Sequence, residues 1–251
     1  MQKKRRTVRS ITFALVLLLT AGMCLQISAD PVFAAGPLQG KSVLIDGDSI
    51  QWSFGKYVES SVRSMGAGYV KNISENAATM APGSKKSKRK NSTFYRISRI
   101  PAWKLQQYDY VILATGTNDY YRFYKIAPGT PDSADIRTTA GALNMVISAI
   151  QLRSPNTKIV VVTPIHRFSG GKNCDFKRSS YSKCTLSDYR AVITATAARY
   201  SNVAVIQGTD ISRANEMNKK KNSRDGLHPT KSYAKKVLAP RFTFLFCATA
   251  L

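Results

Sequence analysis

The sequence predicts an α/β fold, a three-layer sandwich in which a central parallel sheet lies between two layers of helices. The first observation is a set of short apolar, β-branched runs that are typical of buried strands. The second is that segments with helical spacing separate these runs, and strands that alternate with helices form parallel βαβ units. The runs are Ser42–Asp46, Tyr110–Ala114, Lys158–Thr163 and Val203–Ile206, with a weaker one at Tyr69–Ile73.

The predicted helices lie between these strands. Apolar residues occupy one face of Ile50–Met65, and Thr138–Leu152 and Leu186–Tyr200 repeat this pattern. A last helix is expected to begin at Pro229-Thr230 and to run through Leu238, with a break at Pro240 because proline donates no backbone hydrogen bond. The polar segment 81–93 (APGSKKSKRKNST) is expected to be a mobile loop within the domain.

The N-terminus has the pattern of a secretory signal peptide. Cations within residues 3–9 precede an almost continuously apolar stretch, Ile11–Leu25, and Ala34 and Ala35 suit cleavage by signal peptidase. The alternative is an anchor that is not cleaved, because no charge appears between Arg9 and Asp30. We therefore expect a signal peptide over residues 1–35, a single domain over residues 36–251, and a protein that is secreted or held at the cell surface.

Positive charge dominates the chain. Its 251 residues include 38 Lys and Arg against 14 Asp and Glu, which gives a net charge of +24. Such a field attracts polyanions. For an exported protein these are anionic wall polymers or lipid headgroups at a membrane surface rather than a specific nucleic acid. Lys85 and Lys86 in the basic loop are candidates for binding such a substrate. The alternative is a solvated surface that binds acidic matter indiscriminately.

Cysteine and histidine usage bears on redox state and metal binding. Cys174 and Cys184 flank a short basic loop and are expected to form a disulfide in an oxidising compartment, with two free thiols as the alternative. No CxxC pair occurs, and the chain has only two histidines. A zinc site is therefore not expected, and the sequence predicts neither a metal nor a cofactor.

Three residues have the chemistry of an activated nucleophile and its partners. Ser49 follows the first strand and opens a helix. Its backbone N–H and the positive end of that helix would therefore face the point where negative charge develops in the reaction. His228 supplies an imidazole base, and Asp225 lies three residues before it, a spacing that lets one loop present both side chains. The other histidine, His166, has no carboxylate near it in sequence and is interpreted as a polar loop residue.

The second strong strand ends in polar residues that are expected to share a rim with Ser49. The carboxyl ends of parallel strands meet at one edge of a sheet, where ligands bind. Asn118 has a side-chain amide suited to an oxyanion, and Asp119 is expected to brace the loop. Tyr120 and Tyr121 come next and are candidates for substrate binding, with packing against a neighbouring helix as the alternative.

Three ordered motifs resemble blocks I, III and V of the SGNH (GDSL-like) hydrolases. They are Gly-Asp-Ser at 47–49, Gly-Thr-Asn-Asp at 116–119 and Asp-Gly-Leu-His-Pro at 225–229. The resemblance implies a flavodoxin-like fold of the SGNH hydrolase type. It also implies that Ser49 is the nucleophile, that His228 is its general base, and that Asp225 orients the imidazole.

The resemblance further implies an oxyanion hole. Its donors would be the Ser49 backbone N–H, the Asn118 side chain and a glycine N–H from block II. The segment 72–80 is similar to block II, but Ala77 stands where the family has glycine. Alanine still offers its N–H at a negative φ. If the position requires a positive φ, the Cβ of alanine costs about 1 kcal/mol, and the strain could shift the donor.

The activity that follows from the resemblance is ester hydrolysis. We expect a serine esterase that acts on carboxylic esters, including O-acetyl groups, on glycans or wall-associated substrates. Two alternatives remain open: a lipase-like enzyme acting on lysophospholipids, and a catalytically weakened binding protein for anionic polymers. A haloacid-dehalogenase-type phosphatase built on Asp46 and Asp48 is disfavoured, because it needs a later acidic pair and leaves Asn118 unexplained.

Overall fold

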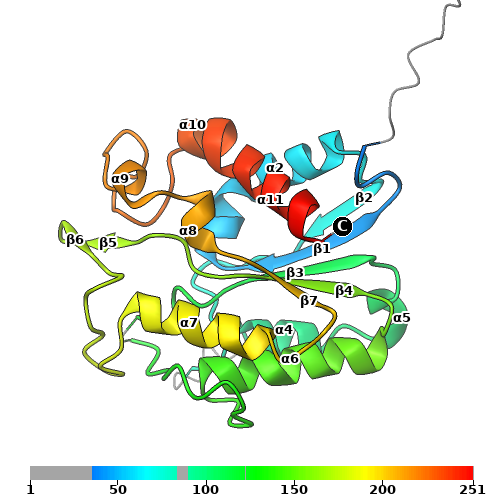
Figure 1. Ribbon diagram of the computed structural model, residues 1–251, viewed down its shortest axis with the longest axis horizontal. Helices are drawn as coiled ribbons and strands as arrows, with labels where there is room; N and C mark the ends of the chain where they lie inside the picture. Colours follow the sequence, from blue (N-terminus) through cyan, green and yellow to red (C-terminus); the bar gives the residue numbers. More distant parts are fainter. Residues whose placement is uncertain (1–35, 84–89, 122, 251) are drawn as a thin grey trace, which may run out of the picture. The chain divides into compact units, whose positions relative to one another are not determined.

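Five parallel strands form the central sheet in the order β2-β1-β3-β4-β7 (Figure 1). The computed structural model describes residues 36–83, 90–121 and 123–250. All the predicted strands are present, including the weaker one, and the predicted three-layer α/β fold is confirmed. The strands are β1 (Ser42–Gly47), β2 (Tyr69–Asn72), β3 (Tyr110–Ala114), β4 (Lys158–Val162) and β7 (Val203–Ile206).

The sheet is buried on both faces, which is why its strands are apolar without interruption rather than alternating with polar residues. In β3, Tyr110 and Ile112 belong to the core on one face, whereas Val111 and Leu113 belong to the core on the other. Successive side chains of a strand point to opposite faces, so a strand buried on both sides needs an apolar residue at every position.

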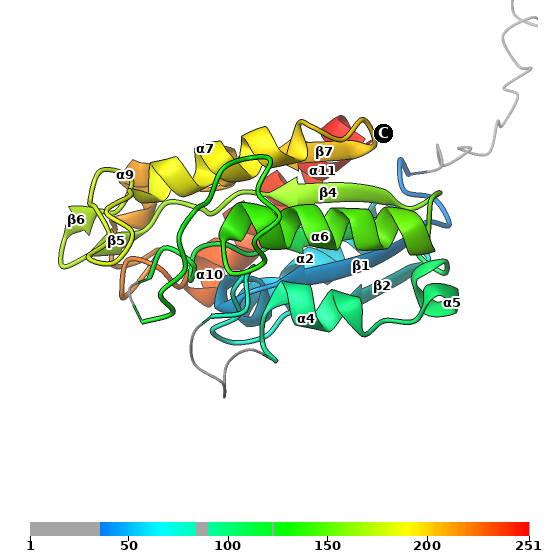
Figure 2. The same cartoon turned by 90° about the horizontal axis from the view of Figure 1, so that it is seen from below.

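Helices cover each face of the sheet (Figures 1 and 2). One layer contains α2 (Ser49–Ser64), η1 (Ala234–Leu238) and α11 (Ala239–Ala250), whose buried residues share a core with β1 and β4. The other layer packs against the opposite core. It contains α4 (Thr93–Ser98), α5 (Ala102–Leu105), α6 (Thr139–Arg153) and α7 (Leu186–Ala197).

Side-chain caps set where the longer helices begin. Asp48 accepts a hydrogen bond from the backbone N–H of Ile50 at the start of α2, and Thr138 caps α6 in the same way. Thr185 and Asp188 form a reciprocal capping box at the start of α7. Each cap satisfies backbone donors that the first turn of a helix leaves without partners.

Short elements complete the fold. They surround the carboxyl edge of the sheet and carry several of the residues discussed below. They are β5 (Phe168–Ser169), β6 (Lys172–Asn173), α8 (Gly208–Ile211), α9 (Ala214–Met217) and α10 (Lys231–Tyr233).

The expected break of the last helix at Pro240 is wrong. The chain continues from α10 through the π-helical turn η1 into α11, with the Ala239 N–H bonded to the Ala234 carbonyl. The wider turn resets the helix just before Pro240, which then lies in the first turn of α11, where a missing N–H costs little. Phe242 and Phe246 remain buried against the sheet.

The predicted disulfide is also absent from the structure, where Cys174 and Cys184 are free cysteines. Cys174 is buried in a small cluster with Tyr120 and Tyr189, and Cys184 packs against the edge of that cluster. Both residues thus contribute to packing in the region where the sequence indicated a covalent link.

Two predictions lie outside the described residues. They are the signal peptide over residues 1–35 and the substrate-binding role of Lys85 and Lys86. Among the helices that the structure describes, none has the length and apolar character needed to span a membrane.

Candidate active site

The site lies at the carboxyl edge of the sheet, where β1 and β3 end side by side with Gly47 opposite Ala114. Ser49 follows β1 as the first residue of α2. Gly47 is required for close packing here, because a Cβ at this position would lie 2.5 Å from the Gln51 side chain. The tight approach brings the start of α2 onto the strand end.

Ser49, His228 and Asp225 form a continuous row of hydrogen bonds. The Oγ atom of Ser49 lies 3.0 Å from Nε2 of His228, and Nδ1 of His228 lies 2.6 Å from Oδ2 of Asp225. The structure thus brings together three predicted residues from two segments that are 179 positions apart. This order of hydroxyl, imidazole and carboxylate is the arrangement that activates a serine.

The loop that carries Asp225 and His228 is closed at its base, where the Thr230 N–H donates to the Asn222 carbonyl at 2.7 Å. At its tip Gly226 has a φ of +76°, and a Cβ there would lie 2.7 Å from the Phe168 side chain. Glycine is therefore needed for both the turn and the close approach. The result is a short loop that presents His228 to Ser49 and Asp225 to the other nitrogen of the imidazole ring.

Hydrogen bonds keep Asp225 ionised. Partial burial acts to raise its pKa, but donation from the His228 ring and from the backbone N–H groups of His228 and Leu227 outweighs burial and lowers the pKa to about 2. The two N–H groups bond to Oδ1 at 2.7 and 2.9 Å, which leaves Oδ2 for the imidazole. The carboxylate is thus oriented as well as charged.

Asp48 lies beside Ser49 in sequence but does not belong to the row of hydrogen bonds. Its side chain is 1% exposed, and Oδ1 accepts the Ile50 N–H at 2.9 Å. Burial raises its pKa to about 7, although the bonds from Ile50 and Thr117 and the nearby His228 act to lower it. Its role in this structure is to cap α2 and so to place Ser49 at the helix start.

Asn118 and Ala77, the two residues expected to serve the oxyanion hole beside Ser49, lie on neighbouring segments. The Asn118 side-chain amide donates to the Ala78 carbonyl at 2.8 Å, so it lies next to the block II segment. Ala77 has a φ of +60°, in the left-handed region that favours glycine. Of the two backbone conformations considered for Ala77, the structure therefore has the strained one with a positive φ.

Asp119 braces the same segment, as predicted. Its carboxylate accepts hydrogen bonds from the backbone N–H groups of Met80 and Ala81 at 2.8 and 3.2 Å, and from the Thr139 hydroxyl at 3.1 Å. Burial raises its pKa to about 6 in spite of these donors. These hydrogen bonds tie the loop after β3 to the end of the block II segment, at the residue that follows Asn118.

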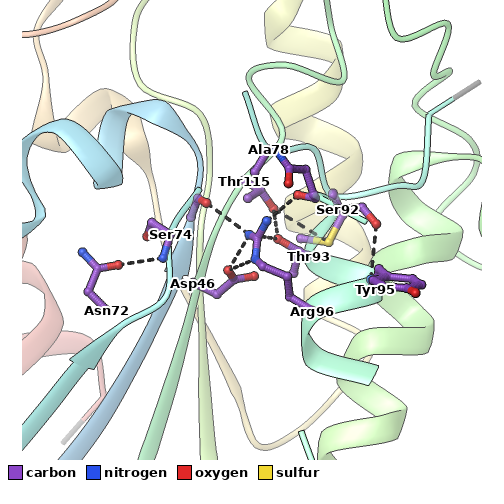
Figure 3. A network of polar contacts seen from close by, with 12 residues as sticks. Asp46, Asn72, Ser74, Ala78, Ser92, Thr93, Tyr95, Arg96 and Thr115 are labelled. Atoms are coloured by element: carbon purple, nitrogen blue, oxygen red, sulfur yellow. Dashed lines mark hydrogen bonds and ion pairs between the residues drawn. The ribbon is translucent and has the colours of Figure 1, made fainter. Parts of the chain in front are cut away.

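Arg96 is a positioning residue that the sequence did not indicate. Figure 3 shows its side chain reaching from α4 to Asp46 at the end of β1, where Nε lies 2.8 Å from Oδ1. The same guanidinium donates to the Gly47 carbonyl at 3.2 Å and to the Asn91 carbonyl. It therefore joins the strand end that precedes Ser49 to the start of α4.

Asp46 is fully buried in this ion pair. Burial raises its pKa, while the charge and hydrogen bonds of Arg96 and the Thr93 hydroxyl act in the opposite direction. With Asp46 paired to Arg96 and Asp48 capping a helix, neither carboxylate is presented as a phosphatase nucleophile or metal ligand. The geometry therefore removes the phosphatase alternative.

His166 lies in a loop, as interpreted, but it has a carboxylate partner that the sequence spacing did not reveal. Nδ1 of His166 lies 2.5 Å from Oδ2 of Asp175, and Arg190 approaches the other oxygen at 2.6 Å. The hydrogen bonds from His166 and the charge of Arg190 outweigh burial and lower the pKa of Asp175. This network fastens the segment after β4 to α7.

The two candidate tyrosines differ in position. Tyr120 is buried, packs edge-on against Tyr189, and donates its hydroxyl to the Lys177 carbonyl at 2.8 Å. Packing, the alternative given by the sequence, therefore describes Tyr120. Tyr121 is half-buried, and the Arg167 guanidinium lies 4.9 Å from its ring centre.

A cavity of about 670 Å³ is lined by Asp225 and His228 together with Arg224 and Lys231. A second cavity, of about 310 Å³, is lined by residues that include Tyr121, which follows Asn118 by three positions. Within residues 36–83, 90–121 and 123–250, no group of three or more His, Cys, Asp and Glu side chains is arranged to hold a metal ion.

The fold recurs in solved structures. The chain is similar to a protein from Lactobacillus plantarum (22% identity, 84% of this chain and 98% of that chain, TM-score 0.64). It is also similar to Est24, a carbohydrate acetylesterase from Sinorhizobium meliloti (18% identity, 83% of this chain and 99% of that chain, TM-score 0.56). A third similar structure is the inhibitor-bound M. smegmatis aryl esterase (18% identity, 83% of this chain and 99% of that chain, TM-score 0.55). At these identities the likeness shows the fold. Among curated proteins, none matches the sequence.

A family model assigns the chain more directly than these structures do. The model of the GDSL-like lipase/acylhydrolase family matches residues 47–234, most of the chain. This range includes all three motifs that resemble the SGNH blocks, and with them Ser49, Asp225 and His228. The chain therefore belongs to the GDSL-like lipase/acylhydrolase family of SGNH ester hydrolases.

Proposed function

We propose that this protein is a serine esterase in which Ser49, His228 and Asp225 act as a catalytic triad on short-chain carboxylic esters. The observation that carries the proposal is the unbroken row of contacts, 3.0 Å from serine to imidazole and 2.6 Å from imidazole to carboxylate. Both distances suit proton transfer and orientation in a triad.

The reaction follows from these positions. His228 Nε2 takes the proton of Ser49 Oγ as the oxygen attacks the acyl carbon, and the ionised Asp225 stabilises the imidazolium that forms. His228 then gives the proton to the departing alcohol oxygen, which leaves an acyl group on Ser49. Water attacks this acyl-enzyme with His228 again as the base, releasing the carboxylic acid and restoring the serine.

The oxyanion hole is proposed to combine three donors: the Ser49 N–H at the start of α2, the Ala77 N–H and the Asn118 amide. Asn118 donates to the Ala78 carbonyl at 2.8 Å, and this contact holds its amide beside the block II backbone. The amide has two N–H groups, so a second one is available for the oxyanion. Donors aimed at a developing negative charge supply a large share of the rate enhancement in such enzymes.

We propose acetyl and other small acyl groups on glycans as the substrates, with the enzyme acting outside the cell. The fold is shared with a carbohydrate acetylesterase, and the cavities beside the site are lined largely by polar and basic residues. The N-terminal pattern of residues 1–35 supports export. N-terminal sequencing of the protein recovered from the culture medium would test where the leader is cut.

The triad is tested with p-nitrophenyl acetate and the Ser49→Ala variant, which should lose about a thousandfold or more in kcat. Ser53→Ala is the matched control, because Ser53 lies exposed on the same helix and its hydroxyl bonds to the Ile50 carbonyl within its own helical turn. A fluorophosphonate probe should label Ser49 in the wild type. Equal rates in wild type and Ser49→Ala would reject the esterase and favour a binding protein.

The substrate class is tested by release of acetate from O-acetylated polysaccharides, compared with release of fatty acid from lysophospholipids. Acetate release that depends on Ser49 and exceeds lysophospholipid cleavage supports the glycan esterase. Much faster cleavage of long-chain lysophospholipids would replace it with the lipase-like function.

A further inference from the structure

The cavity of about 310 Å³ between the loop after β3 and the segment after β4 is lined by three cations, Arg167, Lys177 and Arg178. No Asp or Glu is among its lining residues. Its size falls at the lower end of the range for small-molecule sites, roughly 300–1,000 Å³.

Arg167 is the unusual member of this set. Its Nε and Nη1 atoms are shielded from solvent and have no hydrogen-bond partner among the described residues. The guanidinium is held against aromatic rings, 4.9 Å from the centre of Tyr121 and 5.9 Å from that of Tyr120. Aromatic faces can hold a cation without neutralising it.

The carboxylate of Asp175 does not compensate this charge. Asp175 is hydrogen-bonded to His166 at 2.5 Å and ion-paired with Arg190 at 2.6 Å, and Arg167 forms no ion pair with a carboxylate among the described residues. A guanidinium with two shielded nitrogens that have no partner is costly. An anion in the adjoining cavity would offset that cost and would meet a cation whose position is already set.

The walls of the cavity are connected to the active site on both sides. The Tyr121 N–H bonds to the Asn118 carbonyl at 2.9 Å. On the other side, Phe168, next to Arg167, donates its N–H to the Gly226 carbonyl at 2.8 Å, within the loop of Asp225 and His228. A substrate group in the cavity would therefore lie beside the proposed oxyanion hole and triad.

The remaining lining favours a polar occupant. Three serines, Ser169, Ser179 and Ser180, line the cavity along with the cations. Hydroxyl groups can bond to the hydroxyls of a sugar, whereas an acyl chain is stabilised by apolar walls. The cavity is therefore suited to a charged saccharide rather than to the fatty chain of a lipid.

We propose that this cavity is an anion subsite for the alcohol half of the ester, in which Arg167, assisted by Lys177 and Arg178, binds the carboxylate of an acylated acidic sugar. The proposal rests on the esterase function proposed above and specifies its substrate class. It makes Arg167 a specificity-determining residue.

The test compares two acetylated sugars that differ in one group: an O-acetylated methyl glucuronide and the same compound with its carboxylate replaced by a carboxamide. The wild type should release acetate from the carboxylate compound with a kcat/KM about tenfold or more higher. Arg167→Gln should lose most of this preference. Arg99→Gln should keep it, because Arg99 also stacks on a tyrosine, at 4.3 Å, but does not line the cavity.

Salt and a second variant keep the test independent of any folding defect in Arg167→Gln. The preference should shrink in part between about 50 mM and about 500 mM salt, since salt screens the exposed charges of Lys177 and Arg178. Lys177→Gln changes an exposed side chain and should lower the preference in part while leaving the thermal midpoint unchanged. A preference that is equal in all variants and independent of salt overturns the subsite.

Failure of the subsite and failure of the esterase give different results. Equal acetate release from both sugars leaves the esterase standing and overturns the subsite. If neither sugar is hydrolysed, calorimetric binding of methyl glucuronide to Ser49→Ala, lost in Ser49→Ala/Arg167→Gln, still supports the subsite, and its absence overturns it. If Arg167 instead promotes cleavage of lysophosphatidylglycerol over the acetylated glucuronide, the occupant is a lipid phosphate and the saccharide assignment is overturned.

Discussion

Asp225 shows how backbone groups prepare a side chain for its role. Two N–H groups of its own loop bond to Oδ1, and the imidazole of His228 bonds to Oδ2. The pKa of about 2 follows from these bonds, so the carboxylate remains charged at any pH at which the enzyme would work. The side chain is 53% exposed, so its hydrogen bonds outweigh its burial in setting the pKa.

Asp225→Asn should lower kcat on p-nitrophenyl acetate by about 10³–10⁴-fold, because a neutral amide neither stabilises the imidazolium nor fixes the required tautomer. The variant keeps an oxygen for the two backbone N–H groups, so its thermal unfolding midpoint should change little. Asp132→Asn, an exposed carboxylate outside this loop, is the control. A loss of less than tenfold would contradict the triad.

Ala77 carries strain that can be relieved by one substitution. Because its φ is +60°, Ala77→Gly should raise the free energy of unfolding by about 1 kcal/mol and should leave kcat equal or higher. Urea unfolding measures the first effect. Ala198→Gly, at the C-cap of α7 with a helical φ of −62°, is the matched control and should not be stabilising. A destabilised Ala77→Gly would show that the strain is absent.

At the scale of elements, the ion pair of Arg96 and Asp46 links α4 to the end of β1. The Asp46 side chain is fully buried and that of Arg96 is 12% exposed. The pair also reaches the Gly47 carbonyl, two residues before Ser49. A buried pair of this kind contributes less by its own attraction than by the cost of leaving either partner alone.

Arg96→Met should therefore lower the free energy of unfolding by about 3–5 kcal/mol, because Asp46 is left buried without its partner. The double variant Asp46→Leu/Arg96→Met should be more stable than Arg96→Met alone. Arg137→Met removes an exposed pair with Asp135 and should cost less than about 1 kcal/mol. If the double variant were the least stable protein in urea unfolding, this account of the pair would be wrong.

At the scale of the whole molecule, buried carboxylates gather where β1 and β3 end. Asp46, Asp48 and Asp119 are each at most 1% exposed, and burial raises the pKa of each. A carboxyl group whose pKa is higher in the folded than in the unfolded state makes folding less favourable as the pH rises between the two pKa values. These carboxyl groups therefore make the free energy of unfolding fall as the pH rises, whereas a surface carboxylate in an ion pair makes it rise.

Asp48→Asn isolates this effect. The pKa of Asp48 is raised from 3.8 to about 7, so between about pH 4 and pH 7 the folded protein retains a proton that the unfolded chain has lost. The stability of the wild type relative to the variant should fall across that window and level off above it. Urea unfolding at several pH values checks this, with exposed Asp210→Asn as a control. A constant difference from pH 4 to 8 would contradict it.

The strands, the main helices and the rim residues follow from the sequence alone, because they depend on local patterns. Continuous apolar runs indicate strands buried on both faces, and Asp48 and Thr138 act as helix caps through neighbouring N–H groups. The spacing of Asp225 and His228 within one short loop is likewise local. The order of strands in a doubly wound sheet then brings motifs at strand ends to one edge.

Other features were decided only by the tertiary structure. Asp46 and Arg96 are separated by 50 positions, and nothing local marks them as partners. Asp175 meets His166 because the loop between them folds back against α7. The shielded, unpaired Arg167 is defined by what surrounds it. Contacts between distant residues depend on where the packed strands and helices place their loops. That placement is determined by side chains throughout the core, so no single segment of the sequence predicts it.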